Sequence, residues 1–325
     1  MATYLVTGAA GFIGARVSEF LLADGHTVIG VDNLCDAYDV RLKLWRLERL
    51  KTNTNFVFHH KDLCDLQALE AIFASLPRLD AIIHLAARAG VRYSVEDPWT
   101  FVNANVTGTL NTLEMAKRYK VAKYILASTS SIYGANAPIP TPEEADSSRP
   151  LQPYAATKKA AEALCHSYHF LYDIDVTIFR YFTVYGPAGR PDMVMFRFCQ
   201  WICEGRPVRL NGDGNQSRGF TFVDDIARGT ILGLKPVGYE IINLGGHEVI
   251  TINEMIRMLE QMLGRQAVIE HFPFHQADML TNHANVEKAR SLLGWNPQVG
   301  LREGMQRLVQ WYLTERDWAS QVLTL

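Results

Sequence analysis

The chain has 325 residues, of which 48% are hydrophobic and 20% are charged, and this ordinary globular composition excludes a disordered, collagen-like or coiled-coil protein. The 32 Lys and Arg nearly balance the 34 Asp and Glu, so the formal net charge is -2. This balance provides no global positive field for a nucleic acid or an anionic membrane surface, whereas a few local cations suffice for a small anion.

The first predicted element is a short apolar strand at Tyr4–Val6, and no signal-peptide pattern precedes it. No apolar stretch approaches the ~20 residues that a membrane span needs. Five cysteines are scattered without a Cys-x-x-Cys pair, which is typical of reduced thiols. They are Cys35, Cys64, Cys165, Cys199 and Cys203. We therefore expect a soluble, cytoplasmic protein without disulfides.

From residue 3 to about 180, short apolar runs alternate with longer amphipathic ones. The runs predict strands at 4–6, 27–31, 56–58, 81–83, 124–126 and 176–178. The amphipathic stretches predict helices near 12–23, 41–50, 65–75, 99–120 and 153–172. Because parallel strands need long right-handed crossovers, this order predicts an α/β fold with a Rossmann-type doubly wound parallel sheet. Ligands of such sheets bind at the carboxyl ends of the strands.

After about residue 180 the rhythm gives way to loops rich in Gly and Pro. Helices are predicted at 192–204, 223–234, 251–263, 285–293 and 301–315, with a short strand around 240–243. At roughly 150 residues per domain, the length predicts about two domains. We expect a cofactor domain over 1–180, with a strand returning near 238–244, and a smaller mixed α/β substrate domain over 181–325.

A glycine-rich loop, Gly8-x-x-Gly11-x-x-Gly14, follows the first predicted strand and opens a helix. This pattern favours dinucleotide binding, because the glycines allow a tight turn and a close approach of the pyrophosphate to the helix N-terminus. Asp32 ends the second strand, where a carboxylate binds the adenosine ribose hydroxyls and repels a 2′-phosphate. The predicted cofactor is therefore NAD, although Asp32 is also compatible with a plain strand-end turn.

Further cofactor contacts are predicted after the third and fourth strands. Asp62 and Leu63 are placed to meet the adenine, and Leu85, Ala86 and Ala87 leave room for the cofactor to pass. Both segments are also compatible with ordinary strand-to-helix connections. The candidate residues from the motifs so far are Gly8, Gly11, Phe12, Ile13, Gly14, Asp32, Asn33, Asp62, Leu63, Leu85, Ala86 and Ala87.

Tyr154 and Lys158 are four residues apart and so share one face of a predicted helix. Alone, such a pair is typical of a solvated helix face. Hydroxyls at 128–131, at the end of the fifth strand, would join them at the cofactor. A tyrosine acts as a base near neutrality only if its pKa falls from ~10, which a nearby Lys and the nicotinamide charge can achieve. Together these groups are typical of hydride removal from a carbinol carbon.

These motifs identify the chain as similar to the extended short-chain dehydrogenase/reductases that act on nucleotide sugars. The resemblance covers essentially the whole chain. It rests on the glycine-rich loop, His84–Ala87, Ser128–Gly134, Tyr154-x-x-x-Lys158, Arg180–Pro187 and Arg218-x-x-Thr221-x-Val223-Asp224-Asp225. It implies Thr129 as hydroxyl donor, Tyr154 as base and Lys158 as the ligand of the nicotinamide ribose. The resemblance adds three residues to the cofactor set, namely Tyr154, Lys158 and Asn105. Asn105 matches an asparagine that supports the active site in the family.

Residues beside Thr129 discriminate among the reactions of this family. Relatives that dehydrate sugars carry Asp-Glu after the threonine, and relatives that decarboxylate UDP-uronates carry Glu where Ser131 stands. This chain has Ser130 and Ser131. Of the reactions considered, C4 epimerisation with tightly held NAD is the one that needs no acid at these two positions. Segments 36–43, 89–94 and 182–193 resemble UDP-glucuronate 4-epimerases, and galactose-type epimerases usually carry Asn in place of Thr183.

The substrate set follows from the same resemblance. Thr129, Ser130, Ser131 and Thr183 would surround the C6 carboxylate with neutral donors, which allow the sugar to turn over. The full candidate set is Arg92, Thr129, Ser130, Ser131, Thr183, Arg190, Arg218 and Asp278. Arg218 and Arg190 match diphosphate-side positions, although each is also compatible with a surface ion pair. A second phosphate arginine, which relatives often carry shortly before the Asp278 position, is not evident.

Other functions remain open at this stage. A UDP-glucose or UDP-N-acetylglucosamine 4-epimerase would use the same chemistry, and a UDP-uronate decarboxylase, a net reductase or a catalytically silent binding protein are further alternatives. No metal is predicted, because His59, His60, His271, His275 and His283 lack the spacing of a zinc site. The resemblance implies a homodimer that pairs through the helices at 99–120 and 153–172.

Overall fold

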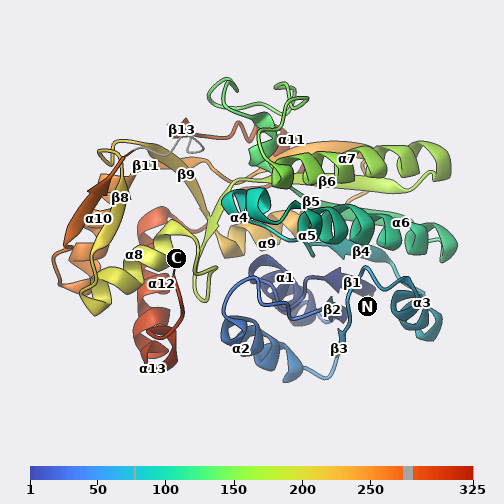
Figure 1. The fold of residues 1–325 in the computed structure, drawn as a ribbon. Helices are drawn as coiled ribbons and strands as arrows, with labels where there is room; N and C mark the ends of the chain where they lie inside the picture. The colour runs from blue at the N-terminus through green and yellow to red at the C-terminus, as the bar shows by residue number, and fades with distance from the viewer. Residues whose placement is uncertain (77, 274–280, 325) are drawn as a thin grey trace.

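The computed structural model describes residues 1–76, 78–273 and 281–324, and its centre is a sheet of seven parallel strands (Figure 1). The strand order is β10-β6-β5-β4-β1-β2-β3, and every neighbouring pair is parallel. The bounds are β1 Thr3–Thr7, β2 Thr27–Asp32, β3 Phe56–His60, β4 Ala81–His84, β5 Lys123–Thr129, β6 Asp175–Tyr181 and β10 Tyr239–Leu244. The predicted Rossmann-type sheet is confirmed, and the strand expected near 240 pairs with β6.

Helices cover both faces of this sheet. The bounds are α1 Phe12–Ala23, α2 Val40–Lys51, α3 Leu66–Ser75, α4 Val91–Glu96, α5 Pro98–Val102, α6 Gly108–Arg118, α7 Pro153–Tyr172 and α9 Val223–Leu232. Leu5 and Val6 belong to different core clusters, because successive side chains of a strand point to opposite faces. One cluster contains buried residues of α1, α2 and α9, and the other contains those of α3, α6 and α7.

The helix expected over 99–120 is not continuous. The chain forms α5, then a π-helical turn at Asn103–Thr107, and then α6. The side chain of Asn105 explains the interruption, because it is buried and bonds the backbone of Arg88 and the hydroxyl of Thr157. A long-range contact therefore overrides local helix propensity at this turn. Single π-helical turns of this kind are frequent at functional sites.

Small sheets and further helices form the rest of the second half. The helices are α8 Val194–Glu204, α10 Ile252–Leu263, α11 Glu287–Leu293, α12 Leu301–Thr314 and α13 Arg316–Ala319. β9 (Ser217–Phe222) pairs with β7 (Thr183–Tyr185), β11 (Glu248–Thr251) and β13 (Thr281–Asn282). β8 (Val208–Asn211) pairs with β12 (Ile269–Phe272). In the described ranges no helix is both long and apolar enough to cross a membrane.

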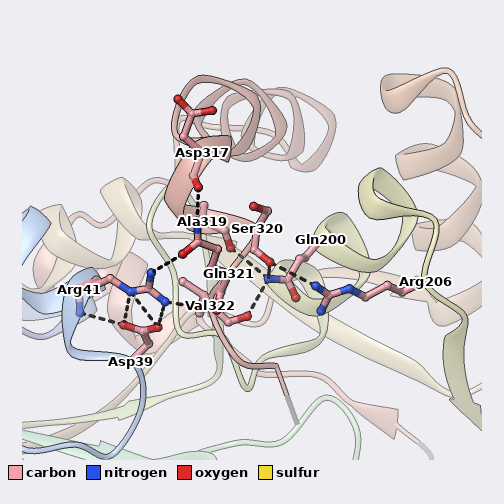
Figure 2. Close-up of polar contacts among 9 residues, drawn as sticks. All are labelled: Asp39, Arg41, Gln200, Arg206, Asp317, Ala319, Ser320, Gln321 and Val322. Atoms are coloured by element: carbon pink, nitrogen blue, oxygen red, sulfur yellow. Dashed lines mark hydrogen bonds and ion pairs between the residues drawn. The ribbon is translucent and has the colours of Figure 1, made fainter.

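The C-terminal segment contacts both halves of the molecule (Figure 2). Gln200 of α8 donates from its side-chain amide to the carbonyls of Ala319 and Val322, at 3.0 and 2.8 Å. Arg41 of α2 donates to the carbonyl and the side chain of Gln321, at 3.2 Å each. The segment therefore lies between the start of α2, which follows the loop after β2, and α8 in the second half.

Candidate active site

The glycine-rich loop connects β1 to α1 and leaves no space for side chains. Gly8 has φ +69°, and a Cβ there would lie 2.8 Å from the backbone nitrogen of Ala86. A Cβ on Gly14 would lie 2.1 Å from the carbonyl oxygen of Gly8. α1 begins at Phe12 without a side-chain cap, so the N–H groups of its first turn lack intrahelical acceptors. Such a cradle at a helix N-terminus fits a pyrophosphate.

Asp32 lies at the end of β2 beside this loop and is buried. Its carboxylate accepts hydrogen bonds from the backbone N–H of Ala10 at 3.1 Å and of Leu34 at 2.8 Å. The ammonium of Lys43 lies 3.9 Å away, in α2. Asp32 therefore ties the glycine-rich loop to the segment after β2, where the adenosine ribose was predicted. Sequence reasoning missed Lys43, although it lies on the buried face of its helix.

The residues predicted to meet the adenine, Asp62 and Leu63, follow β3. The side-chain amide of Asn33 donates to the carboxylate of Asp62 at 2.8 Å. Burial raises the pKa of Asp62, but hydrogen bonds from the backbone of Cys64 and from Asn33 outweigh it and leave that pKa below its usual value. Leu63 is buried, and its carbonyl accepts from Asn111 at 2.8 Å. These contacts bring the ends of β2 and β3 together.

The predicted passage after β4 lies beside the glycine-rich loop. The backbone N–H of Ala86 donates to the hydroxyl of Thr7 at 3.1 Å, and that hydroxyl also meets the ring of His84 at 2.9 Å. Burial lowers the pKa of His84 to about 3, so this ring is neutral. After β4, Leu85 and Ala86 are half-buried and Ala87 is exposed. The two alanines are small side chains beside the ends of β1 and β4.

Thr129 and Tyr154 meet across the ends of β5 and α7. The Thr129 hydroxyl lies close enough to the Tyr154 phenol to lower its pKa, and it donates to Ser131 at 3.2 Å. Burial raises the pKa of Tyr154 above its usual value, while the Thr129 hydroxyl and the charge of Arg190 lower it. Among the described groups Arg190, rather than the expected Lys158, is the cation that lowers this pKa.

Lys158 is buried one helical turn after Tyr154. Burial lowers the pKa of its ammonium to about 8, and the charge of Glu162 opposes this effect. The predicted pair of a phenol and an ammonium therefore shares one face of α7. The same face continues to Glu162, which sequence reasoning did not single out although its i+4 spacing from Lys158 was a usable signal.

Glu162 anchors a buried polar cluster next to Lys158 on α7. Its carboxylate accepts from the Arg180 guanidinium at 2.9 and 3.0 Å and from the Ser128 hydroxyl at 2.6 Å. Arg180 also donates to the Tyr133 hydroxyl, which in turn donates to Asn243 of β10 at 2.6 Å. The cluster joins α7 to the ends of β5, β6 and β10, and so holds Thr129 and Tyr154 in register.

Asn105 is a positioning residue in this structure rather than an open surface group. It donates to the Arg88 carbonyl at 3.0 Å and accepts from the Arg88 N–H at 2.8 Å. It also donates to Thr157, which precedes Lys158 on α7. The π-helical turn thus fixes the segment after β4 against the catalytic helix.

The predicted substrate residues are spread over several loops. The Arg190 guanidinium donates to Asp192 at 3.0 Å and to the Ala89 carbonyl at 3.4 Å, and its charge reaches Tyr154. Ser130 is buried and meets Asn282 of β13 at 3.5 Å. Thr183 begins β7, Arg92 lies in α4, and Arg218 lies in β9 and donates to the Ser217 carbonyl at 2.8 Å. Asp278 and His275 lie outside the described residues.

The residues present fit NAD and a nucleotide sugar better than a metal. Within the described ranges, no three His, Cys, Asp or Glu side chains gather into a metal-binding group. The cradle at Gly8–Gly14 and the Asp32 carboxylate fit the pyrophosphate and the ribose of a dinucleotide. Thr129 and Tyr154 lie at the end of β5 and at the start of α7.

Comparison with known proteins agrees with this geometry. Residues 4–245 match the model of the NAD dependent epimerase/dehydratase family. The UDP-glucuronate 4-epimerase of Thermodesulfobacterium geofontis is 55% identical over 312 residues, which are 96% of this chain and 96% of that protein.

Solved structures are similar over nearly the whole chain. The UDP-glucuronic acid 4-epimerase of Bacillus cereus, in complex with UDP-glucuronic acid and NAD, is 36% identical with a TM-score of 0.89, covering 96% of this chain and 99% of that one. A UDP-glucose 4-epimerase of Thermotoga maritima with UDP-glucose is 32% identical, also with a TM-score of 0.89, covering 97% and 99%.

Proposed function

The chain belongs to the NAD dependent epimerase/dehydratase family, and we propose that it is a UDP-glucuronate 4-epimerase that interconverts UDP-glucuronate and UDP-galacturonate. The observation that carries the proposal is the position of Thr129, at the end of β5 near Tyr154 of α7, beside the neutral hydroxyls of Ser130 and Ser131. Neither serine supplies the acid that dehydration or decarboxylation would use at this position. The 55% identity to the Thermodesulfobacterium geofontis enzyme supports the choice of a uronate.

Thr129 and Tyr154 would move the proton of the C4 hydroxyl. Tyr154 would take this proton during oxidation to the 4-keto sugar and return it during reduction, while Thr129 holds the oxygen. NAD, when bound, supplies a hydride acceptor at C4 and then the same hydride for the opposite face. The glycine-rich loop and Asp32 would hold the dinucleotide, and Lys158 would hold its nicotinamide ribose.

Two charges act on Tyr154 in opposite directions: Arg190 lowers its pKa, and Asp192, the ion-pair partner of Arg190, raises it. Because burial raises its pKa in the protein alone, the phenolate needs nearby positive charge. Arg190 supplies part of it from the loop after β7. Substrate binding at Arg190 would thus bear on both orientation and proton transfer.

Epimer analysis tests this function directly. Purified protein is incubated with UDP-glucuronate, UDP-glucose or UDP-N-acetylglucosamine without added NAD, and the epimers are resolved. We expect turnover of the uronate above the neutral sugars, and a 10²- to 10⁴-fold lower kcat for Tyr154→Phe. The control Tyr119→Phe changes a tyrosine at the end of α6, away from the site. Turnover of the neutral sugars with none of the uronate would overturn the substrate assignment.

The assembly that fits this enzyme is a homodimer. Large apolar side chains are exposed at Val95 of α4 and Trp99 of α5, and again at Phe170 and Leu171 near the end of α7, with Trp99 78% and Phe170 80% exposed. Figure 1 shows α5, α6 and α7 together on one side of the sheet. Exposed apolar side chains of this size are typical of a subunit interface. Sedimentation should give a dimer for the wild type and a monomer for Trp99→Glu.

The cellular location that fits is the cytoplasm. All five cysteines are free in the structure, as a reducing compartment requires. Fractionation of the source cells with an antibody against the protein tests this placement.

A further inference from the structure

Arg46 of α2 is a buried guanidinium that contacts three separate loops. It is 3% exposed. It donates to the Ala10 carbonyl in the glycine-rich loop at 3.0 Å and to the Tyr38 hydroxyl in the loop after β2 at 2.9 Å. It donates twice to the Ala188 carbonyl, at 3.1 and 2.5 Å, in the loop that leads to Arg190. One side chain therefore joins the cofactor loops to a substrate loop.

All of these acceptors are neutral. Among the residues that the structure describes, no carboxylate lies within 4.0 Å of the Arg46 guanidinium. Its other close neighbours are aromatic, with the Phe12 and Tyr38 rings centred 5.8 and 5.6 Å away. A buried charge without a carboxylate partner is costly to a fold, so its retention needs another gain. Its place beside the phosphate-binding cradle points to the site itself.

The loop that Arg46 holds is conformationally demanding. Ala188 has φ +50°, a left-handed conformation that residues other than glycine adopt at a cost. Two hydrogen bonds from Arg46 to its carbonyl favour this conformation. Gly189 follows, where a Cβ would lie 3.7 Å from the Phe12 ring, and then comes Arg190. The position of Arg190 opposite Tyr154 therefore depends on the turn at Ala188.

We propose that Arg46 is a positioning residue that couples the cofactor site to the nucleotide-sugar site. It holds the turn at Ala188 against the glycine-rich loop and thereby aims Arg190 at the substrate. The proposal rests on the proposed function in that Arg190 faces a nucleotide sugar. It predicts that a defect at Arg46 appears in the binding of both ligands, although Arg46 touches the reacting carbon of neither.

The test compares Arg46→Lys with Arg49→Lys, a matched change one turn further along the same helix. Arg49 is 57% exposed and pairs with Glu19 at 3.4 Å, so its change should leave all readouts as in the wild type. For Arg46→Lys we expect a loss of NAD per purified chain and an increase of at least 10-fold in the calorimetric Kd for UDP and in KM. With NAD restored to saturation, kcat should also fall, but by less than in Tyr154→Phe, because Arg190 lowers the pKa of Tyr154 without replacing it as the base.

A second change tests the route through Ala188. Glycine adopts φ +50° without strain, so Ala188→Gly added to Arg46→Lys should recover a several-fold part of the lost UDP affinity. If Arg46→Lys keeps the wild-type NAD content and UDP Kd, or if Ala188→Gly recovers nothing, the proposal is wrong. Should Arg46→Lys fail to fold, Tyr38→Phe is the deciding variant. We expect it to increase the UDP Kd about 3-fold, and an unchanged UDP Kd would refute the proposal.

These readouts separate the proposal from the proposed function. NAD content and UDP affinity do not depend on which sugar is epimerised. A wild type that does not convert UDP-glucuronate would refute the function and leave the test of Arg46 intact.

Discussion

Two regions of the molecule bury a guanidinium, and they treat its charge differently. Between α7 and β6, Arg180 pairs with Glu162 at 2.9 Å, and each side chain is 2% exposed. At the cofactor face, Arg46 is equally buried but bonds only carbonyls and a phenol in the described chain. A buried charge with an internal partner serves to hold the fold together, and we call such a pair part of the frame. A buried charge without one marks the face where anionic ligands are expected.

Lys158 belongs with Arg46 in this comparison. It is buried at the catalytic end of α7, and burial holds its pKa at about 8. Within the described residues no carboxylate lies within 4.0 Å of its ammonium, and Glu162 is engaged with Arg180 and Ser128. The face that meets the ligands therefore carries charge that costs the protein stability, as functional sites often do.

The largest effect is expected at the paired region. Glu162→Ala leaves the Arg180 guanidinium buried without its partner and removes the acceptor of Ser128. We expect a loss of about 3–5 kcal/mol in the free energy of unfolding, measured by urea denaturation. The double variant Glu162→Leu/Arg180→Met should recover most of this loss. A loss below about 1 kcal/mol for Glu162→Ala would show that the pair is not part of the frame.

The next effect is a pH dependence at Lys158. Its folded pKa of about 8 lies below the unfolded value of 10.5, so between these values the unfolded chain binds more protons. The free energy of unfolding should therefore gain a contribution from Lys158 as pH rises from 8 to 10.5, with an upper limit of about 3 kcal/mol. Below pH 8 both states carry the charge, and the cost of burying it is fully present.

Lys158→Met isolates this contribution from other groups that titrate in the same range. The variant should be more stable than the wild type at pH 7, and the difference should shrink as pH rises toward 10.5. Chemical denaturation at a series of pH values measures it. A difference that is constant over this range would show that Lys158 is not a buried, uncompensated cation.

The comparison also explains what could be predicted from the sequence. The α1 and α7 helices have the predicted bounds, because their patterns are local and strands frame them. The glycine-rich loop, Asp32, Tyr154 and Lys158 could be proposed from the sequence because their spacing and their places after predicted strands point to one chemistry when taken together. β7, β9 and β11 were not predicted, because these short strands depend on pairing partners distant in the chain.

Arg46 shows the limit most clearly. In the sequence it resembles the solvated arginines of an amphipathic helix, and only its contacts with Ala10 and Ala188 reveal its place. A signal was present, since Arg46 lies four residues from both Leu42 and Leu50 on the buried stripe of α2. A polar residue at such a position indicates either a buried pair or a ligand-facing charge, and the distinction needs the fold.

The smallest effect is expected where a guanidinium is neither buried nor alone. Arg41 is 43% exposed, pairs with Asp39 and reaches Gln321 of the C-terminal segment (Figure 2). Because water screens this pair, Arg41→Ala should lower the free energy of unfolding by less than about 1 kcal/mol. NAD content and UDP affinity should not change, since Gln200 holds the segment independently. A loss of NAD in Arg41→Ala would mean that the C-terminal segment, and not only Arg46, supports the loop after β2. The division between charges that hold the fold together and charges that face the ligands would then have to include exposed residues.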